Sequence, residues 1–296
     1  MDRGIQRHLA FVEAVERGSL TRAAERLFCS QSSVSRMIAD LEREWDVTLL
    51  RRDRAGVQLT SDGASLLPAS REIVDAYRRM REKVEGVRDL VAGCIRIGCI
   101  SSVATHRLPS IIGTFRSEYP GIEYELLLGD YTDIERWLRE GRVDCGFLRA
   151  PCSRGIDAAP FERDELMAVF PKGHDLAKAD AVPLTAFLDE PFLALEHGAD
   201  TEVAALFAEA GIAPHMSLHT WDDYAIMAMV EGGLGLAILP SLILNRVPYE
   251  VETRPLDPPA YRKLVFATKS GARPSAALTR FREHLLKHAV AANSRA

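Results

Sequence analysis

The N-terminal part of the chain carries apolar positions at helical spacing in three successive stretches. The first stripe runs from Ile5 to Val15 and ends at Gly18, a residue type that commonly terminates helices. The second lies in GSLTRAAERLF, where Ser19 or Thr21 can cap a helix by accepting a hydrogen bond from its first turn. The third follows the short break FCS. The pattern therefore predicts three short helices joined by tight turns.

The third stretch, CSQSSVSRMIADLE, has two chemically different faces. Val34, Ile38 and Leu41 fall on one stripe and predict burial, while short hydroxyls and arginines occupy the other face. Ser30 is placed to cap this helix. A helix that enters the DNA major groove needs short donors and acceptors near its N-terminus, and arginines that reach guanine edges or phosphates. The candidate base-contacting residues are Gln31, Ser32, Ser35 and Arg36.

A basic turn between two strands follows the third helix. The segment VTLLRRDRAGVQLT reads as a strand, an arginine-rich turn and a return strand over residues 57–60. With the preceding helix pair it predicts a winged helix-turn-helix, in which Arg52 and Arg54 can hold the phosphate backbone or reach the neighbouring minor groove. The alternative is an ordinary solvated helix with a charged loop, and the wing makes that alternative the weaker one.

From Ser61 to about Val91 the sequence predicts one long helix with an apolar seam. Apolar residues from Ile73 onward step alternately by four and three residues, which is the spacing of a coiled coil. Pro68 removes a backbone donor, so a kink is expected near it. The seam predicts packing against a partner helix, and the alternative is packing against the C-terminal part of the same chain.

Residues 93–296 alternate predicted strands with predicted helices. AGCIRIGCI, IEYELLLGD and RVDCGFLRA read as strands of a first set. A second set runs from ELMAVFPKGHDLA to GLAILP, and KLVFATKSG with the final helix returns to the first. The alternation predicts two α/β lobes built on parallel sheets with helices on both faces. The predicted helices cover about 105–118, 133–140, 201–210, 222–231 and 275–289.

Candidate ligand contacts follow from this layout, because ligands of such sheets bind beyond the carboxyl ends of the strands. Ser101 and Ser102 follow the first strand and can cradle a carboxylate, although a serine there can equally be a simple cap. Arg149 follows another strand and can pair with an anion, so we expect an anionic effector. The candidates in the second lobe are His197, Thr201 and Thr220.

Charge is unevenly distributed along the chain. The 296 residues allow two or three domains, and the net charge of −5 is not typical of a DNA-binding protein. Residues 1–60 hold ten arginines against nine acidic residues, a net charge of +1, whereas residues 93–296 carry −6. The prediction of DNA binding therefore depends on local arrangement. The sequence contains no apolar run of membrane-spanning length and no signal segment, so we expect a cytoplasmic protein without membrane association.

Several kinds of chemistry find little support in the sequence. The five cysteines are odd in number and never spaced C-x-x-C, which argues against a disulfide framework or a zinc site. Cys145 and Cys152 stay open as a redox-responsive pair. We find no nucleophile elbow and no His-Glu-x-x-His motif, so neither an enzyme nor a metal or cofactor is expected. A small-molecule-binding protein or enzyme without a DNA role is a further alternative, but it would leave residues 1–60 without a purpose.

These motifs resemble a known family. FVEAVERGSLTRAAERL, SQSSVSRMIADLE and LLRRDRAGVQLTSDG are similar to the DNA-binding domain of LysR-type transcriptional regulators, with departures at Cys29 and in LLRR. FRSEYPGIEYEL, LREGRVDCGFL, FPKGHDLA and VEGGLGLAILP resemble the family's effector domain, which is built like type 2 periplasmic solute-binding proteins. The resemblance implies a winged helix-turn-helix over 1–60, a linker and dimerisation helix over 61–92 and a two-lobed α/β effector domain over 93–296, with lobe I about 93–161 and 266–296 and lobe II about 162–265.

The resemblance also implies a function. A member of this family binds double-stranded promoter DNA, and a small-molecule effector held between the two lobes switches that binding or the activation of the promoter. The chain would act as a homo-oligomer, a dimer through residues 61–92 and further a tetramer, with RNA polymerase as another partner. It also implies that Gln31, Ser32, Ser35 and Arg36 face the bases and that Arg52 and Arg54 serve the wing.

Overall fold

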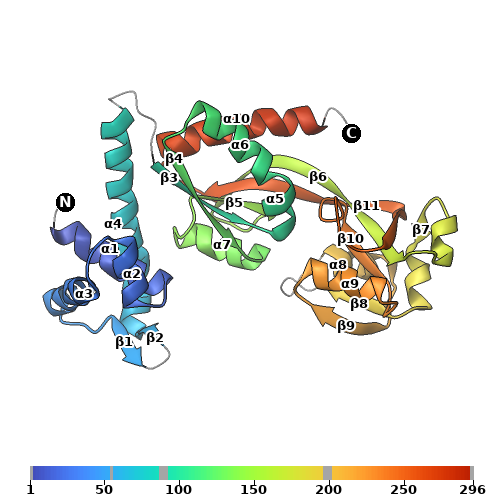
Figure 1. Ribbon diagram of the computed structural model, residues 1–296, viewed down its shortest axis with the longest axis horizontal. Helices are drawn as coiled ribbons and strands as arrows, with labels where there is room; N and C mark the ends of the chain where they lie inside the picture. Colours follow the sequence, from blue (N-terminus) through green and yellow to red (C-terminus); the bar gives the residue numbers. More distant parts are fainter. Residues whose placement is uncertain (1–2, 54–55, 87–92, 196–201, 294–296) are drawn as a thin grey trace. The chain divides into compact units, whose positions relative to one another are not determined.

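The computed structural model describes residues 3–53, 56–86, 93–195 and 202–293 (Figure 1). The chain divides into two compact units, Met1–Gly93 with Glu140–Arg142, and Cys94–Arg139 with Val143–Ala296. None of the helices within these residues has the length and apolar character needed to cross a membrane.

Three short helices begin the first unit: α1 (Arg3–Glu16), α2 (Leu20–Arg26) and α3 (Gln31–Trp45). The predicted caps are confirmed, because Ser19 accepts a hydrogen bond from the Arg22 amide and Ser30 accepts one from the Ser33 amide at 3.2 Å. The predicted inner face of α3 is confirmed as well. Its buried side chains, which join a core with α1 and α2, are Val34, Ile38 and Leu41.

A two-stranded antiparallel hairpin follows, made of β1 (Leu50–Asp53) and β2 (Gly56–Leu59). Glu42 of α3 fastens the hairpin to the helices, because its Oε1 accepts hydrogen bonds from the amides of Leu49 at 2.8 Å and Leu50 at 3.1 Å. A charged acceptor that serves two backbone donors fixes where the hairpin leaves the helical core.

The long helix α4 (Ser61–Gly86) belongs to the same unit as the three short helices. Its inner face, which includes the buried Leu67 and Val74, packs on the core of the first unit, while Ile73 and Met80 are 39% and 55% exposed. The helix runs through Pro68, and the expected kink stays a prediction. The seam positions in 87–92 lie outside the described residues.

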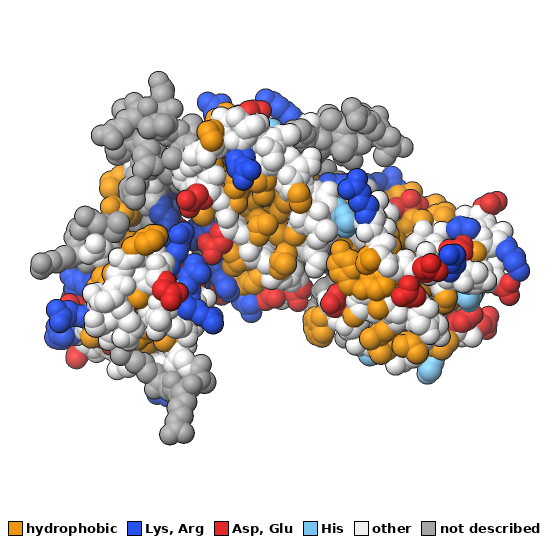
Figure 2. All heavy atoms as spheres, in the orientation of Figure 1, with side chains coloured by type: hydrophobic (Ala, Val, Ile, Leu, Met, Phe, Trp, Pro, Cys, Tyr) orange, Lys and Arg blue, Asp and Glu red, His pale blue; other side chains and the backbone are white. Residues whose placement is uncertain are grey.

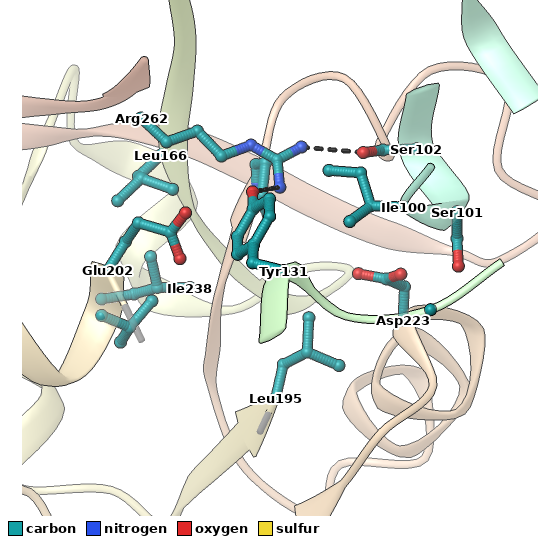
Figure 3. A pocket seen from close by; sticks show the side chains of 13 residues that line it. Ile100, Ser101, Ser102, Tyr131, Leu166, Leu195, Glu202, Asp223, Ile238 and Arg262 are labelled. Atoms are coloured by element: carbon teal, nitrogen blue, oxygen red, sulfur yellow. Dashed lines mark hydrogen bonds between the residues drawn. The ribbon is translucent and has the colours of Figure 1, made fainter. Parts of the chain in front are cut away.

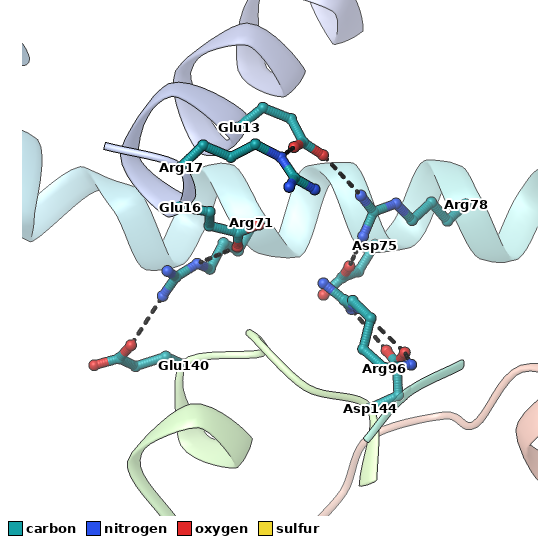
Figure 4. Close-up of polar contacts among 9 residues, drawn as sticks. All are labelled: Glu13, Glu16, Arg17, Arg71, Asp75, Arg78, Arg96, Glu140 and Asp144. Carbon is teal, nitrogen blue, oxygen red and sulfur yellow. Dashed lines mark hydrogen bonds and ion pairs between the residues drawn. The ribbon is translucent and has the colours of Figure 1, made fainter. Parts of the chain in front are cut away.

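Ion pairs join α1 to α4 (Figure 4). Glu13 accepts a hydrogen bond from Arg17 at 3.2 Å and lies 3.8 Å from the Arg78 guanidinium. Arg71, only 5% exposed, lies 3.5 Å from Glu16. Because these charges are partly withdrawn from water, their pairing selects one packing of α4 on α1.

A mixed sheet of seven strands organises the second unit, in the order β10-β6-β11-β5-β3-β4, with β7 pairing to β11. The strand β3 is parallel to β5, but β6 and β11 run antiparallel to each other and to their neighbours β10 and β5. The strands are β3 (Gly93–Cys99), β4 (Ile122–Leu128), β5 (Cys145–Arg149), β6 (Ile156–Pro171), β7 (Val182–Pro183), β10 (Ala237–Pro240) and β11 (Val251–Lys269).

The prediction of purely parallel sheets was therefore wrong. The strands β6 and β11 are long and pass from one lobe to the other (Figure 1), so each lobe receives antiparallel strands. Only their apolar ends, ELMAVF and KLVFATK, have the pattern of buried strands. The charged stretches between, such as FERDE, interrupt that pattern where the strands cross between lobes.

Helices cover the strands of each lobe. They are α5 (Ser101–His106), α6 (Leu108–Glu118), α7 (Tyr131–Arg139), α8 (Glu202–Ala210), α9 (Asp223–Glu231) and α10 (Ala276–Asn293), with short 3₁₀ turns over Asp175–Lys178 and Leu184–Leu188. The single helix predicted over 105–118 is two, because the chain breaks at Arg107. The final helix returns to the first lobe, where Phe281 meets Phe115 edge-on at 5.3 Å.

The second lobe contains a smaller parallel sheet of β8 (Phe192–Leu195) and β9 (Met216–Thr220). Its core includes Phe187, Phe192 and Phe207, which meet edge to face. On the face shown in Figure 2, acidic and basic side chains both lie on the second unit, together with patches of exposed hydrophobic side chains.

The Glu42 contacts generate a prediction about stability. Glu42→Ala leaves two part-buried amides without their acceptor, so it should lower the free energy of opening of the first unit by about 1–3 kcal/mol. Native-state hydrogen exchange of α1 and α3 measures this unit by itself. Glu44→Ala is the matched control on the same helix. Its exposed pair with Arg7 should contribute less than about 1 kcal/mol. Equal effects of the two substitutions would contradict the anchoring role of Glu42.

Candidate functional site

The N-terminal end of α3 presents a continuous exposed stretch. Gln31, Ser32 and Arg36 are exposed and Ser35 is half-buried, so the helix face opposite its apolar stripe is open to a partner. The cap residue Ser30 also exchanges hydrogen bonds with the hydroxyls of Ser32 and Ser33, each at 2.8 Å. This network holds small polar groups at the end of the helix where the dipole is positive.

Phe28, in the turn before α3, was missed by the sequence analysis. Its side chain is 93% exposed and its backbone has a φ of 51°, a left-handed conformation that bulky residues rarely adopt. No sequence pattern signals this exposure, because FCS simply looks like an apolar residue at a helix end. The exposed stretch at this turn therefore runs from Phe28 through Ser33.

The basic turn is only partly described. Arg51 is exposed on β1 opposite Gln58, and Arg52 lies on β1 opposite Val57. The side chain of Arg52 and the whole of Arg54 lie outside the described part of the structure. The hairpin that carries them follows the candidate recognition helix directly and is fastened to it through Glu42.

A hollow in the second unit is lined from both lobes (Figure 3). It holds about 600 Å³ of empty space when its open mouth and the adjoining solvent are included. Its polar lining combines hydroxyls, one guanidinium and two carboxylates, and its apolar lining is aliphatic. The lining residues are Ile100, Ser101, Ser102, Gly129, Tyr131, Leu166, Leu195, Glu202, Val203, Asp223, Ile238, Pro240 and Arg262.

A buried ion pair forms the back of this hollow. Arg262 of β11 lies directly across from Asp164 of β6 in the strand ladder. Its Nε and Nη2 lie 2.8 Å and 2.7 Å from Asp164 Oδ2, and the two side chains are only 8% and 1% exposed. Asp164 Oδ1 accepts two further hydrogen bonds at 2.9 Å, from the Ser241 hydroxyl and the Leu242 amide. The carboxylate is thus fully engaged.

Arg262 also reaches the helices of the first lobe (Figure 3). Its Nη2 donates to Ser102 Oγ at 2.8 Å and its Nη1 donates to the Tyr131 hydroxyl at 3.3 Å. Burial alone would lower the pKa of Arg262, but attraction by the charged Asp164 and Glu202 raises that pKa, so the group stays charged. Burial raises the pKa of the Tyr131 phenol, which therefore keeps its proton.

Only some of the predicted effector residues line the hollow. Ser101 and Ser102 line the hollow, whereas Arg149 is not among the lining residues. Arg149 instead lies 3.7 Å from Glu202 and 5.9 Å from the Tyr131 ring centre. Thr220 also lies outside the lining, and its hydroxyl accepts from the Asp222 amide at 3.4 Å. His197 and Thr201 lie outside the described residues.

Four polar lining residues were missed by the sequence analysis: Tyr131, Glu202, Asp223 and Arg262. A usable signal existed for three of them, because Tyr131, Glu202 and Asp223 stand at the beginnings of helices. Arg262 lies in the middle of a long strand, in a charged stretch that does not look like a buried strand.

The described cysteines form no disulfide, and Cys145 and Cys152 lie in environments that suppress the thiolate. Burial raises the pKa of Cys145 well above its usual value, and burial and then Glu135 raise the pKa of Cys152. A thiol with a raised pKa is mostly protonated at neutral pH and reacts slowly with oxidants. Among the described residues no group of histidine, cysteine or acidic side chains is arranged to hold a metal ion.

Comparisons with known proteins agree along the chain. A family model described as bacterial regulatory helix-turn-helix protein, lysR family, matches residues 5–64, and one described as LysR substrate binding domain matches residues 88–290. The chain is 30% identical over 276 residues to the uncharacterized HTH-type transcriptional regulator YvbU of Bacillus subtilis, covering 92% of this chain and 94% of that protein.

Two further similarities cover almost the whole chain. The RuBisCO operon transcriptional regulator of Allochromatium vinosum is 30% identical over 294 residues, which is 96% of each protein. The crystal structure of full-length CbnR complexed with its target DNA superimposes with a TM-score of 0.68 at 22% identity, covering 97% of this chain and 99% of that one. At that identity the superposition shows the fold alone.

The thiol environments generate a prediction. Mild peroxide should leave Cys145 and Cys152 unmodified in the folded protein, because both thiols have raised pKa values. Mass spectrometry of the native protein measures each site, and the exposed Cys29 is the internal control for reagent access. Rapid formation of a bond between Cys145 and Cys152 would restore the redox-responsive alternative.

Proposed function

The chain belongs to the LysR family of transcriptional regulators, and we propose that it binds promoter DNA through α3 and the β1–β2 hairpin under control of a small ligand in the hollow of the second unit. Family membership makes the chain a regulator of transcription and not an enzyme. The observation that carries the proposal is α3, whose apolar face is buried in the core of the first unit while its N-terminal polar face is exposed.

We assign the proposed DNA contacts from the chemistry of each side chain. Ser32 and Ser35 offer short hydrogen-bonding groups near the helix start, and Gln31 can read an adenine edge. Arg36, one turn further, can reach a guanine edge or a phosphate. The wing residues Arg52 and Arg54 would hold the backbone or the minor groove. CbnR, similar in fold, was crystallised with its target DNA, which supports a DNA-bound form of this architecture.

The ligand we propose carries a carboxylate. Ser102 and Tyr131 accept hydrogen bonds from Arg262, so each hydroxyl keeps its own hydrogen to donate to another acceptor. The Ser101 hydroxyl lines the same hollow. Since β6 and β11 pass between the lobes, a ligand that contacts both lobes can select one arrangement of them.

Self-association through residues 61–92 is part of the proposal. Ile73 and Met80 leave apolar surface exposed on α4, which a partner helix could bury. A dimer would present two recognition helices at a fixed spacing on the duplex, and a tetramer four. We further propose RNA polymerase as a partner at the promoter and the cytoplasm as the location, since that is where the DNA target lies.

Arg36 carries a testable part of the DNA assignment. Selection of fragments with the parental protein first defines its preferred site. Arg36→Ala should then lose about 1–3 kcal/mol of discrimination between that site and random DNA, because a base contact is removed. Competition binding measures the ratio, and Arg116→Ala in α6, an exposed arginine of the other unit, is the control.

Arg52→Ala should have the opposite signature, because a phosphate contact is independent of sequence. It should weaken binding to all DNA alike and reduce the slope of log affinity against log salt by about one. If Arg36→Ala keeps the parental ratio of specific to random binding, the assignment of α3 as recognition helix is wrong.

The effector site is tested by thermal stabilisation. The screen uses small carboxylates, amino acids among them. At least one compound should raise the melting temperature of the parental protein, because a ligand that binds only the folded state stabilises it. The double variant Ser101→Ala with Ser102→Ala should lose that increase. Ser117→Ala, which removes a hydroxyl on exposed α6, should keep it. An unchanged ligand response of the double variant would place the site elsewhere.

A further inference from the structure

The hollow of the second unit carries more negative than positive charge. Among the residues that line or back it, three carboxylates (Asp164, Glu202 and Asp223) face two guanidinium groups (Arg149 and Arg262). The charge of Arg262 is already matched by Asp164, with which it makes two short contacts. A ligand that brought only negative charge would therefore enter a site where the positive charge is already compensated.

Glu202 has a carboxylate oxygen in this hollow that lacks a hydrogen-bond donor. Its Oε1 is buried and makes no hydrogen bond, and its Oε2 lies 3.7 Å from Arg149, too far for a hydrogen bond. A buried carboxylate oxygen without a donor is costly, so the site gains when a donor arrives. Figure 3 shows the Glu202 carboxylate directed toward the hollow beside Tyr131.

A second carboxylate approaches from another element. Asp223 lies in the first turn of α9, is 7% exposed and lines the hollow. The cap of α9 is the neighbouring Asp222, which accepts from the Tyr224 amide at 2.8 Å. Figure 3 shows its carboxylate turned toward the hollow.

We infer that the effector carries an ammonium group beside its carboxylate, as an amino acid or a small amino carboxylate does. The inference rests on the proposed function and specifies the ligand class of the same site. The ammonium donates to the unsatisfied Glu202 and is attracted by Asp223. The carboxylate accepts from the hydroxyls of Ser101, Ser102 and Tyr131, close to the Arg262 guanidinium. The aliphatic part of the lining suits an apolar side chain.

Thermal stabilisation of the full-length protein by matched pairs of compounds tests this inference. The probes are the common L-amino acids, each compared with the 2-hydroxy acid of the same side chain. We expect at least one amino acid to raise the melting temperature, and its hydroxy acid to do so much less. Glu202→Gln, of the same size, should weaken binding of that amino acid roughly 10- to 100-fold, as loss of a charged hydrogen bond predicts.

Glu209→Gln is the matched control, because Glu209 lies on the same helix and is exposed. It should leave the affinity unchanged. If hydroxy acids stabilise as well as amino acids, or if Glu202→Gln binds the amino acid with parental affinity, the inference is overturned while the proposal of a carboxylate effector survives. If no amino acid stabilises the protein while another small carboxylate of the screen does, the inference alone is overturned; if no small carboxylate of any kind stabilises it, both are overturned.

Discussion

The Arg262–Asp164 pair joins most of the parts that make the second unit a site. It lies across the β6–β11 ladder, accepts the end of β10 through Ser241 and Leu242, and extends to Ser102 and Tyr131 in the first lobe. A buried ion pair contributes little net stability against well-packed apolar residues, yet loss of one partner costs about 3–5 kcal/mol. The pair therefore acts mainly by positioning the elements around it. The hydrogen bonds of the two charged groups can all form in only one arrangement of these strands and helices.

In α3, too, buried contacts decide how a functional surface is oriented. Burial of its apolar stripe in the helical core sets the rotation of the helix about its own axis, and this rotation decides which side chains face outward. The outward set is polar and begins at the capped end of the helix. Glu42 then fixes where the hairpin leaves α3, so the exposed face of the helix and the hairpin are held together.

Much of the fold could be predicted from the sequence, because local rules decide it. The caps Ser19 and Ser30, the stripe of α3 and the strand–helix alternation depend on residues close together in the chain. The antiparallel course of β6 and β11 could not be predicted, since charged residues in the middle of a strand look like loop. Asp164 and Arg262 are such residues, and each is tolerated in a strand only because the other lies opposite.

The site was predictable to a lesser degree. Serines after the first strand marked one wall, since the ends of strands next to helix starts are read from local sequence. Glu202 and Asp223 stand at helix starts of the second lobe, and only the three-dimensional arrangement brings them to the same space as Tyr131. Arg149 was expected to be free for a ligand, but Glu202, distant in sequence, lies beside it.

The continuity of β6 and β11 limits how the lobes can move. Because the adjacent strands β6 and β11 run through both lobes, rotation of one lobe relative to the other must twist both strands. The lobes cannot separate from each other while the hydrogen bonds between these strands remain. The ladder is interrupted between Pro255 and Ala260 and again between Leu264 and Val265. Torsion is cheapest at such interruptions, where no regular hydrogen bonds are lost. Arg262 lies between these two interruptions, so the residue at the back of the hollow belongs to the strand segment that a rotation of the lobes would twist.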